Sequence, residues 1–197
     1  RNINYGLFVS VNSGVIKNIV FEYFDRVCAV NDGNVAINGA GIVCGENRGS
    51  IENCELNARG EFLYYYIDGI DGSCEFQTHF GGFAGKNCGR IINVKADYTD
   101  FYLRLRTIAD SEDMFGESMI EAKTCTGGIA GYMSDISAEC RNIVISGRNV
   151  VFNLTSNGIG DAKEYRYAGA VVADMSNGGR VDNVIVDFSP EYTEELN

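Results

Sequence analysis

The sequence predicts an all-β protein, a right-handed parallel β-helix of about five irregular turns. One segment recurs five times in the 197 residues. It begins with glycine and apolar residues, continues with a turn that contains Asn or Gly, and ends with Ile or Val, any residue, Asn and an apolar residue. Such self-similarity is typical of stacked repeats. One proline and 24 glycines suit short strands and tight turns. The copies close, 35 to 49 residues apart, at Asn18, Asn53, Asn93, Asn142 and Asn183.

Each copy is expected to supply three strands. The first is the glycine-rich segment, such as residues 81–85, where glycine suits a tight corner or a close approach of backbone. The second carries the closing Asn, as in residues 91–96, and the third is rich in aromatic residues, as in residues 61–67. Parallel crossovers are almost always right-handed, so the coil should have that hand.

The closing Asn marks a bend, because apolar residues on both sides of it are expected to face inward. Asn tolerates the left-handed conformation, and identical side chains stacked turn on turn can hydrogen-bond along the axis. We therefore expect the five asparagines to form a structural ladder and to take no part in catalysis.

The third strand has the alternation of a strand with one buried face. Aligned on the closing Asn, the inward positions are Leu63, Tyr65, Leu103 and Leu105. The remaining side chains should form an outward face on adjacent turns: Tyr64, Tyr66, Tyr102, Arg104 and Arg106. Tyr and Arg are enriched where surfaces recognise other molecules, so this set is the candidate ligand-binding site. An alternative is that loops cover the face or that Arg only stacks on Tyr.

The pattern Gly-Gly-Ile-Ala-Gly, a turn and Ile-x-Asn-Cys resembles the GLUG repeat of large bacterial surface proteins and of the N-terminal region of IgA1-specific metalloproteases. The likeness is best at residues 41–56 and 81–96; in the outer copies Tyr5-Gly6 and Ala168-Gly169 replace the double glycine. The resemblance implies an extracellular or cell-surface setting and a binding, spacing or adhesin-like role. It supplies no catalytic residue, and no His-Glu-x-x-His occurs in the chain.

Composition narrows the function classes. The net charge of −11 argues against nucleic acid, and no run approaches the ~20 apolar residues of a membrane span. The chain should be a single β-helix repeat domain over residues 1–197, a piece of a larger protein. The seven cysteines include no Cys-x-x-Cys. Cys28, Cys54 and Cys140 occupy inward positions and should be buried free thiols, whereas Cys74, Cys88 and Cys125 can be exposed.

Little in the sequence points to catalysis. His79 is the single histidine; it can pair with Cys74 or Cys88, but no third group orients the pair. Asp68 and Asp71 lie in a glycine-rich connection that is either a weak calcium site or an ordinary solvated loop. No cofactor is expected.

We therefore expect a non-catalytic extracellular or cell-surface repeat domain that binds a host protein or glycan. Two alternatives stay open. One is an enzyme that acts on polysaccharide, which would need a column of carboxylates along one strand face. The other is a passive spacer in a secreted protease or adhesin.

Overall fold

The computed structural model describes residues 3–32, 37–69, 75–110, 121–158, 163–188 and 191–193. Within these ranges every regular element is a β-strand, so none of the described residues forms a helix that could cross a membrane. The strands form three parallel sheets, and each sheet takes one segment from every copy of the repeat. The expectation of an all-β chain with parallel pairing is confirmed.

The first and second sheets each contain five strands. In order across the first sheet, these are β1 (Ile3–Gly6), β6 (Ile37–Gly41), β10 (Glu75–Gly81), β13 (Glu121–Gly127) and β16 (Lys163–Gly169). Across the second sheet they are β17 (Val172–Asp174), β14 (Ala130–Met133), β11 (Ala84–Asn87), β7 (Cys44–Asn47) and β2 (Val9–Asn12).

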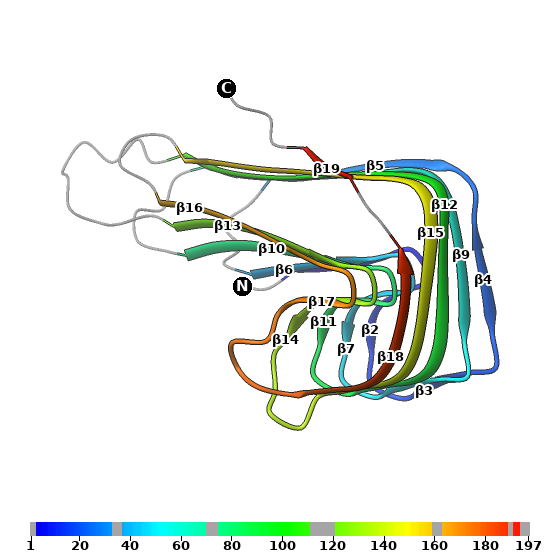
Figure 1. The fold of residues 1–197 in the computed structure, drawn as a ribbon. Coiled ribbons are helices and arrows are strands. Elements are labelled where there is room, and N and C mark those ends of the chain that lie inside the picture. Colours follow the sequence, from blue (N-terminus) through cyan, green and yellow to red (C-terminus); the bar gives the residue numbers. More distant parts are fainter. Residues whose placement is uncertain are drawn as a thin grey trace.

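The third sheet is longer and curls around the core (Figure 1). Its main path is β18 (Arg180–Phe188), β15 (Glu139–Gly158), β12 (Arg90–Asp110), β8 (Ser50–Glu52) and β3 (Val15–Lys17). Four more strands extend this sheet. β9 (Glu55–Gly69) pairs with β12, and both β4 (Val20–Tyr23) and β5 (Arg26–Asp32) pair with β9. β19 (Glu191–Thr193) pairs with β15.

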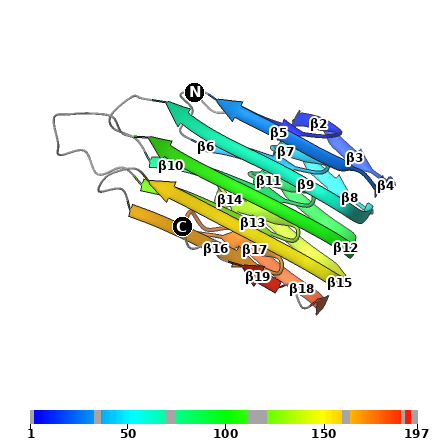
Figure 2. The same cartoon turned by 90° about the horizontal axis from the view of Figure 1, so that it is seen from above.

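The chain visits the first, second and third sheets in turn and then repeats the circuit. Figure 1 shows the corresponding strands of successive copies one behind another, and Figure 2 shows them side by side from above. The core lies inside this circuit and includes rings of Phe62, Phe80 and Phe101 that are at most 1% exposed. Aromatic contacts continue between copies; the rings of Phe62 and Phe80 are 4.9 Å apart.

The five closing asparagines lie in one line at a corner of the third sheet. Each has a positive φ between 52° and 57°, as the bend requires. The side-chain amide of each asparagine after Asn18 donates to the Oδ1 of the asparagine one copy earlier. The distances are 3.3 Å for Asn53 to Asn18, 3.0 Å for Asn93 to Asn53, 2.6 Å for Asn142 to Asn93 and 2.7 Å for Asn183 to Asn142. We call this row the outer ladder.

A second asparagine row, which we did not expect, lies inside the coil. Asn12 donates to Asn47 and Asn47 donates to Asn87, both at 2.8 Å. All three side chains are buried, and Asn87 Nδ2 ends the row on the carbonyl of Glu139. The sequence contains the signal, because each of these residues opens an Asn-x-Gly turn six residues before an outer-ladder asparagine. We call this row the inner ladder.

The expected facing of the third strand is wrong in the first and second copies. The pairing of β12 with β9 shifts between Tyr98 and Phe101, because β12 has one more residue at this corner, Asp100, with a φ of 52°. Leu103 therefore pairs with Phe62 and not with Leu63. Tyr64 lies opposite Leu105, points inward and is only 1% exposed. Tyr65, expected inside, is instead half-buried.

Glycines allow the backbones of the first and second sheets to meet directly. A Cβ added at Gly85 of β11 would lie 2.6 Å from the carbonyl carbon of Gly39 and still closer to the amide nitrogen of Ala40, both in β6. Gly45 of β7 faces Tyr5 of β1 in the same way. The recurring glycines thus create a contact between two sheets in which no side chain fits.

Cysteine burial follows the corrected register. Cys44, Cys54, Cys125 and Cys140 are buried, but Cys28 is exposed because it pairs with Leu63 on the outward side of β9. The expectation of buried thiols is therefore confirmed for Cys54 and Cys140 and wrong for Cys28. Cys88 is partly exposed, and Cys74 lies outside the described residues.

Alkylation of the native protein should therefore label Cys28 at least about tenfold faster than the four buried cysteines. Burial also raises the pKa of Cys44, Cys125 and Cys140 to about 12, which suppresses the reactive thiolate. Peptide mapping by mass spectrometry after a short treatment with iodoacetamide at pH 8 would measure the rates. Equal labelling of Cys28 and Cys140 would contradict the register of the third strand.

Candidate functional site

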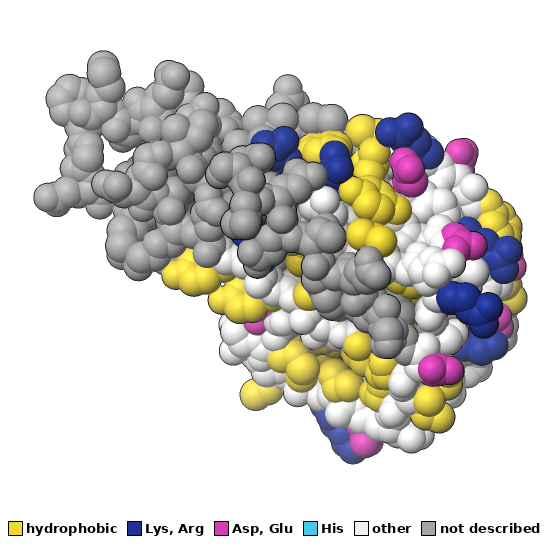
Figure 3. Space-filling model, turned by 45° about the horizontal axis from the view of Figure 1, so that its top comes forward, with side chains coloured by type: hydrophobic (Ala, Val, Ile, Leu, Met, Phe, Trp, Pro, Cys, Tyr) yellow, Lys and Arg dark blue, Asp and Glu magenta, His cyan; other side chains and the backbone are white. Residues whose placement is uncertain are grey.

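An outward face of the third sheet carries tyrosine and arginine side chains from two neighbouring copies. We define the tyrosine–arginine face as Tyr65 of β9 and Tyr102, Arg104 and Arg106 of β12. Arg106 lies opposite Tyr65 in the pairing of the two strands. All four side chains are half-buried. Figure 3 shows Lys and Arg side chains next to a band of hydrophobic side chains on the side that includes the top of the molecule.

Arg104 is the centre of this face. Its Nη2 donates to the hydroxyl of Tyr102 at 3.1 Å, and its guanidinium lies 5.9 Å from the centre of the Tyr102 ring. Hydrogen bonds to Tyr65 and then to Tyr102 raise the pKa of Arg104 further above its ordinary value. The arginine is thus always charged and is held between two tyrosines.

The strand beneath the face is held in place from inside. Leu103 and Leu105 alternate with the outward residues and are fully buried. On the same outward side, Leu63 and Asn153 flank Arg104 in the pairing and are also buried. Aromatic rings and guanidinium donors on one face of a strand suit recognition of a flat or carboxylate-bearing ligand.

The predicted binding residues divide into three groups. Tyr102, Arg104 and Arg106 lie on one face, as expected. Tyr64 does not belong to it, because the corner insertion turns Tyr64 inward, where its ring lies 5.7 Å from that of Tyr5. The side chains of Tyr66 and Asp68 and all of Asp71 lie outside the described residues, so the calcium expectation is not addressed. Tyr65 is the residue that the sequence alignment missed.

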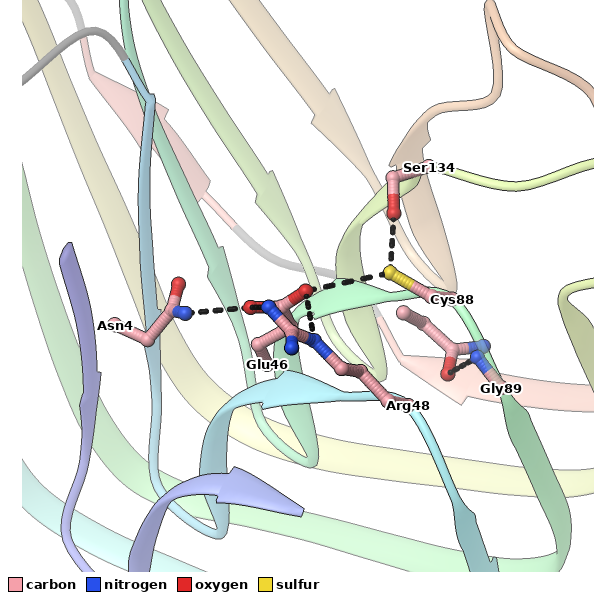
Figure 4. Close-up of polar contacts among 7 residues, drawn as sticks. Asn4, Glu46, Arg48, Cys88, Gly89 and Ser134 are labelled. Atoms are coloured by element: carbon pink, nitrogen blue, oxygen red, sulfur yellow. Dashed lines mark hydrogen bonds and ion pairs between the residues drawn. The ribbon is translucent and has the colours of Figure 1, made fainter. Parts of the chain in front are cut away.

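A separate polar cluster surrounds Glu46, which is only 7% exposed (Figure 4). Asn4 donates to Oε2 of Glu46 at 2.6 Å, and Arg48 Nε donates to Oε1 at 2.8 Å. Burial alone would raise the pKa of Glu46, but the bonds from Arg48 and the charge of Lys86 lower it below its ordinary value. Cys88 Sγ lies 2.8 Å from Ser134 Oγ and 3.6 Å from Glu46 Oε1.

This cluster does not have the properties of a nucleophilic site. Burial raises the pKa of Cys88, which disfavours the thiolate. His79 does not orient Cys88, because its Nε2 bonds Gln77 at 2.8 Å and its ring stacks on Tyr132 at 4.7 Å. Across the ranges that the structure describes, no three His, Cys, Asp or Glu side chains are grouped to hold a metal ion. We assign these contacts to the packing of the first sheet on the second.

His79 should make the protein sensitive to mild acid. Its side chain is fully buried; burial first, and then the charge of Lys123, lower the pKa of His79 to about 3. Below about pH 6.5, His79 is protonated in the unfolded chain but stays neutral in the folded chain. The free energy of unfolding therefore falls as the pH falls from 6.5 toward 3. The loss between pH 6.5 and pH 5 should be about 2 kcal/mol.

Urea titrations at several pH values would measure this effect. A His79→Phe variant keeps a ring against Tyr132 but cannot titrate, so its stability should fall less steeply over the same interval. Parallel pH profiles for the two proteins would show that carboxylates, and not His79, cause the acid sensitivity.

Comparison of the chain with protein-family models, with curated proteins and with solved structures found no match. Function is therefore inferred from the geometry of the tyrosine–arginine face.

Proposed function

We propose that this chain is a right-handed parallel β-helix of five turns that binds a ligand through its tyrosine–arginine face and catalyses no reaction. The observation that carries the proposal is the pairing of Arg104 with Tyr65 and Tyr102 on a strand whose inward residues are fully buried. The circuit through three parallel sheets and the asparagine rows support the β-helix. A rigid array of this kind loses little conformational entropy when a ligand binds.

The ligand class that suits the face is a carboxylate-bearing glycan or an acidic segment of a host protein. Arg offers planar donors that match a carboxylate, and Tyr rings offer flat apolar surfaces for sugars and side chains. The face is basic in a chain whose net charge is −11, so it is a local exception to the acidic surface. The resemblance of the repeat to the GLUG type supports a role outside the cell, on a bacterial surface or in a secreted protein.

One observation favours the polysaccharide-acting enzyme as a second candidate. Asp97 and Asp187 line a groove of about 450 Å³ and flank Ser146 in successive copies. Two strand spacings separate them by ~10 Å, close to the separation of the carboxyl groups in inverting glycosidases. An Asp97→Asn variant that abolishes release of reducing sugar would establish the enzyme. Absence of any turnover by the unmodified chain would exclude the enzyme.

A binding screen against arrays of acidic and neutral glycans and against host extracellular proteins tests the proposed function. For any ligand found, Arg104→Ala and Tyr102→Ala should each weaken binding by about thirtyfold, which is ~2 kcal/mol. Arg141→Ala is the matched control, because Arg141 is a half-buried arginine on β15 outside the face. Thermal melts of all three variants would show that the fold is retained.

Two outcomes would contradict the assignment. If Arg104→Ala destabilises the fold while binding by the folded fraction is unchanged, the face belongs to the scaffold. If no ligand class binds at all, the chain is a passive spacer.

A further inference from the structure

A groove of about 510 Å³ crosses the corner where the chain passes from the second sheet to the third. Its central part comes from the Asn-x-Gly turns of the second and third copies, with Arg48, Ser50, Cys88 and Arg90. Among the residues that the structure describes, no Asp or Glu side chain lines it. A groove with two arginines and no carboxylate stands out in a chain whose net charge is −11.

The stacking of the turns explains why this corner is hollow. Ser50 lies between Val15 and Arg90 in one column, so a short side chain stands between two longer ones. Backbone bonds of 2.9 Å from Ser50 to Gly14 and from Arg90 to Gly49 hold the turns one above another. The glycines beside this column add no side chain, and the space over Ser50 stays open.

Both arginines can contact one ligand in this groove. Arg48 aligns with Cys88, two residues before Arg90, so one strand spacing and two residues separate the arginine Cα atoms by at most ~8 Å. Arg48 donates to Glu46 from Nε at 2.8 Å and from Nη2 at 3.0 Å (Figure 4), so its Nη1 stays available. Arg90 Nη2 lies 3.6 Å from Glu52, too far for a hydrogen bond.

Ser50 is a second and independent sign of a ligand. It is only 4% exposed and lines the groove, yet within the described ranges its hydroxyl has no hydrogen-bond partner. A buried hydroxyl without a partner is costly, and a bound acceptor would remove that cost. The two guanidinium groups and this hydroxyl come from three positions around one space. A tetrahedral anion has oxygens in several directions to meet them, whereas the two oxygens of a carboxylate lie in one plane with its carbon.

We propose that this groove binds a tetrahedral oxoanion, the sulfate or phosphate group of a larger ligand. Arg48 and Arg90 supply charge-assisted hydrogen bonds, and the hydroxyl of Ser50 supplies a third donor. All three residues belong to the second and third copies, in the interior of the described stack. The site lies apart from the tyrosine–arginine face, so the inference is independent of the proposed function.

A titration of the ¹⁵N-labelled chain with sodium sulfate, sodium phosphate or sodium acetate at constant ionic strength tests the proposal. Sulfate or phosphate should give saturable shifts of the amide signals of residues 48–50 and 88–90, with an affinity at least about fivefold above that of acetate. Whichever of the two binds more tightly identifies the ester that the natural ligand carries.

Two variants test the residues of the site. Arg90→Ala should weaken anion binding about tenfold. Ser50→Val keeps both charges but removes the hydroxyl and fills the hollow, so a loss of at least about fivefold would separate a built site from general attraction. Thermal melts would confirm that both variants are folded.

Arg180→Ala is the matched control. Arg180 occupies the same column as Arg90 two copies further on and pairs with Asp182 at 2.7 Å, but it does not line the groove. Its replacement should leave anion binding unchanged. Arg104→Ala should also have no effect here, which keeps this result separate from that of the tyrosine–arginine face.

Cys88 provides a readout that needs no variant. Its side chain lines the groove, so a saturating concentration of the bound anion should slow its alkylation by iodoacetamide at pH 8 about threefold or more. Alkylation of the exposed Cys28, on β5, should not change. No saturable shift up to ~50 mM sulfate or phosphate, equal affinity for acetate, or equal losses in Arg90→Ala and Arg180→Ala would each overturn the proposal.

Discussion

Replacing Gly85 with alanine should destabilise the protein by about 3 kcal/mol or more. The new Cβ would lie 2.6 Å from the carbonyl carbon of Gly39 and closer to the backbone of Ala40. Both neighbours are main-chain atoms of β6, which is itself bonded to strands on either side, so no flexible group can move away. The midpoint of a urea titration, compared with that of the unmodified chain, measures the effect.

Gly14→Ala is the control for this substitution. No heavy atom lies within 4 Å of a Cβ placed at Gly14, and its φ does not require glycine. This variant should be neutral or more stable by a few tenths of a kcal/mol, because alanine restricts the unfolded chain. If the two alanine variants had equal midpoints, the direct contact between the first and second sheets would be wrong.

Asn47→Ala should have the second-largest effect, a loss of about 3 kcal/mol. Asn47 is the middle member of the inner ladder and is fully buried. Its loss leaves the amide of Asn12, the Oδ1 of Asn87 and the carbonyl of Arg90 without the bonds that Asn47 supplies. A buried polar group that loses its hydrogen-bond partner is no longer compensated for its loss of water, which destabilises the folded chain. Guanidinium unfolding monitored by circular dichroism would measure the loss.

The outer ladder provides the comparison. Asn93→Ala should lower the free energy of unfolding by about 1–2 kcal/mol. The lost hydrogen bonds are exposed to water and contribute little, but alanine is strained at the φ of 54° that this position has. Asn93→Gly should recover most of that strain, since glycine adopts this conformation freely. Asn18→Ala, at the end of the row, should cost less than Asn93→Ala. An Asn47→Ala loss smaller than that of Asn93→Ala would contradict the burial of the inner ladder.

Much of the fold can be predicted from the sequence because its strongest signals are periodic. The spacing of Asn18, Asn53, Asn93, Asn142 and Asn183 predicts which segments align, and the pairing of the strands follows that alignment. Counting residues from the closing asparagine cannot predict that the next corner, between the second and third strands of a copy, is longer in some copies than in others. Asp100 and Asn149 add a residue there, as their positive φ values of 52° and 54° show.

The consequence of this extra residue falls on the candidate site. One residue reverses the facing of a strand, so the same count that placed Arg104 correctly placed Tyr64 on the wrong side. The apolar character of the side chains does not reveal the error, because Leu63, Tyr64 and Tyr65 can each lie on either the inward or the outward face of the strand. The pairing of Asp100 with Asn149, whose side chains bond at 2.8 Å, is a feature that a second alignment on the corner residues would find.

The buried polar groups could not be predicted for a different reason. Glu46, Lys86 and Tyr132 belong to one column of the second sheet, yet they share no residue type that would mark the column in the sequence. Their burial depends on how closely the first sheet approaches the second, and that distance is set by glycines elsewhere in the repeat.

The stacking of the repeats in register is the claim on which the tyrosine–arginine face depends. Val15 and Arg180 are exposed ends of one column that also contains Ser50, Arg90 and Glu139. Four strand spacings should separate their backbones by ~19 Å, although 164 residues intervene in the chain.

Pulsed electron–electron resonance between nitroxides at these two positions, attached through non-natural residues in dilute protein, measures this distance directly. We expect one narrow distribution centred between about 20 and 30 Å once the label arms are included. A broad distribution, or a peak beyond about 35 Å, would show that the repeats do not stack in this register.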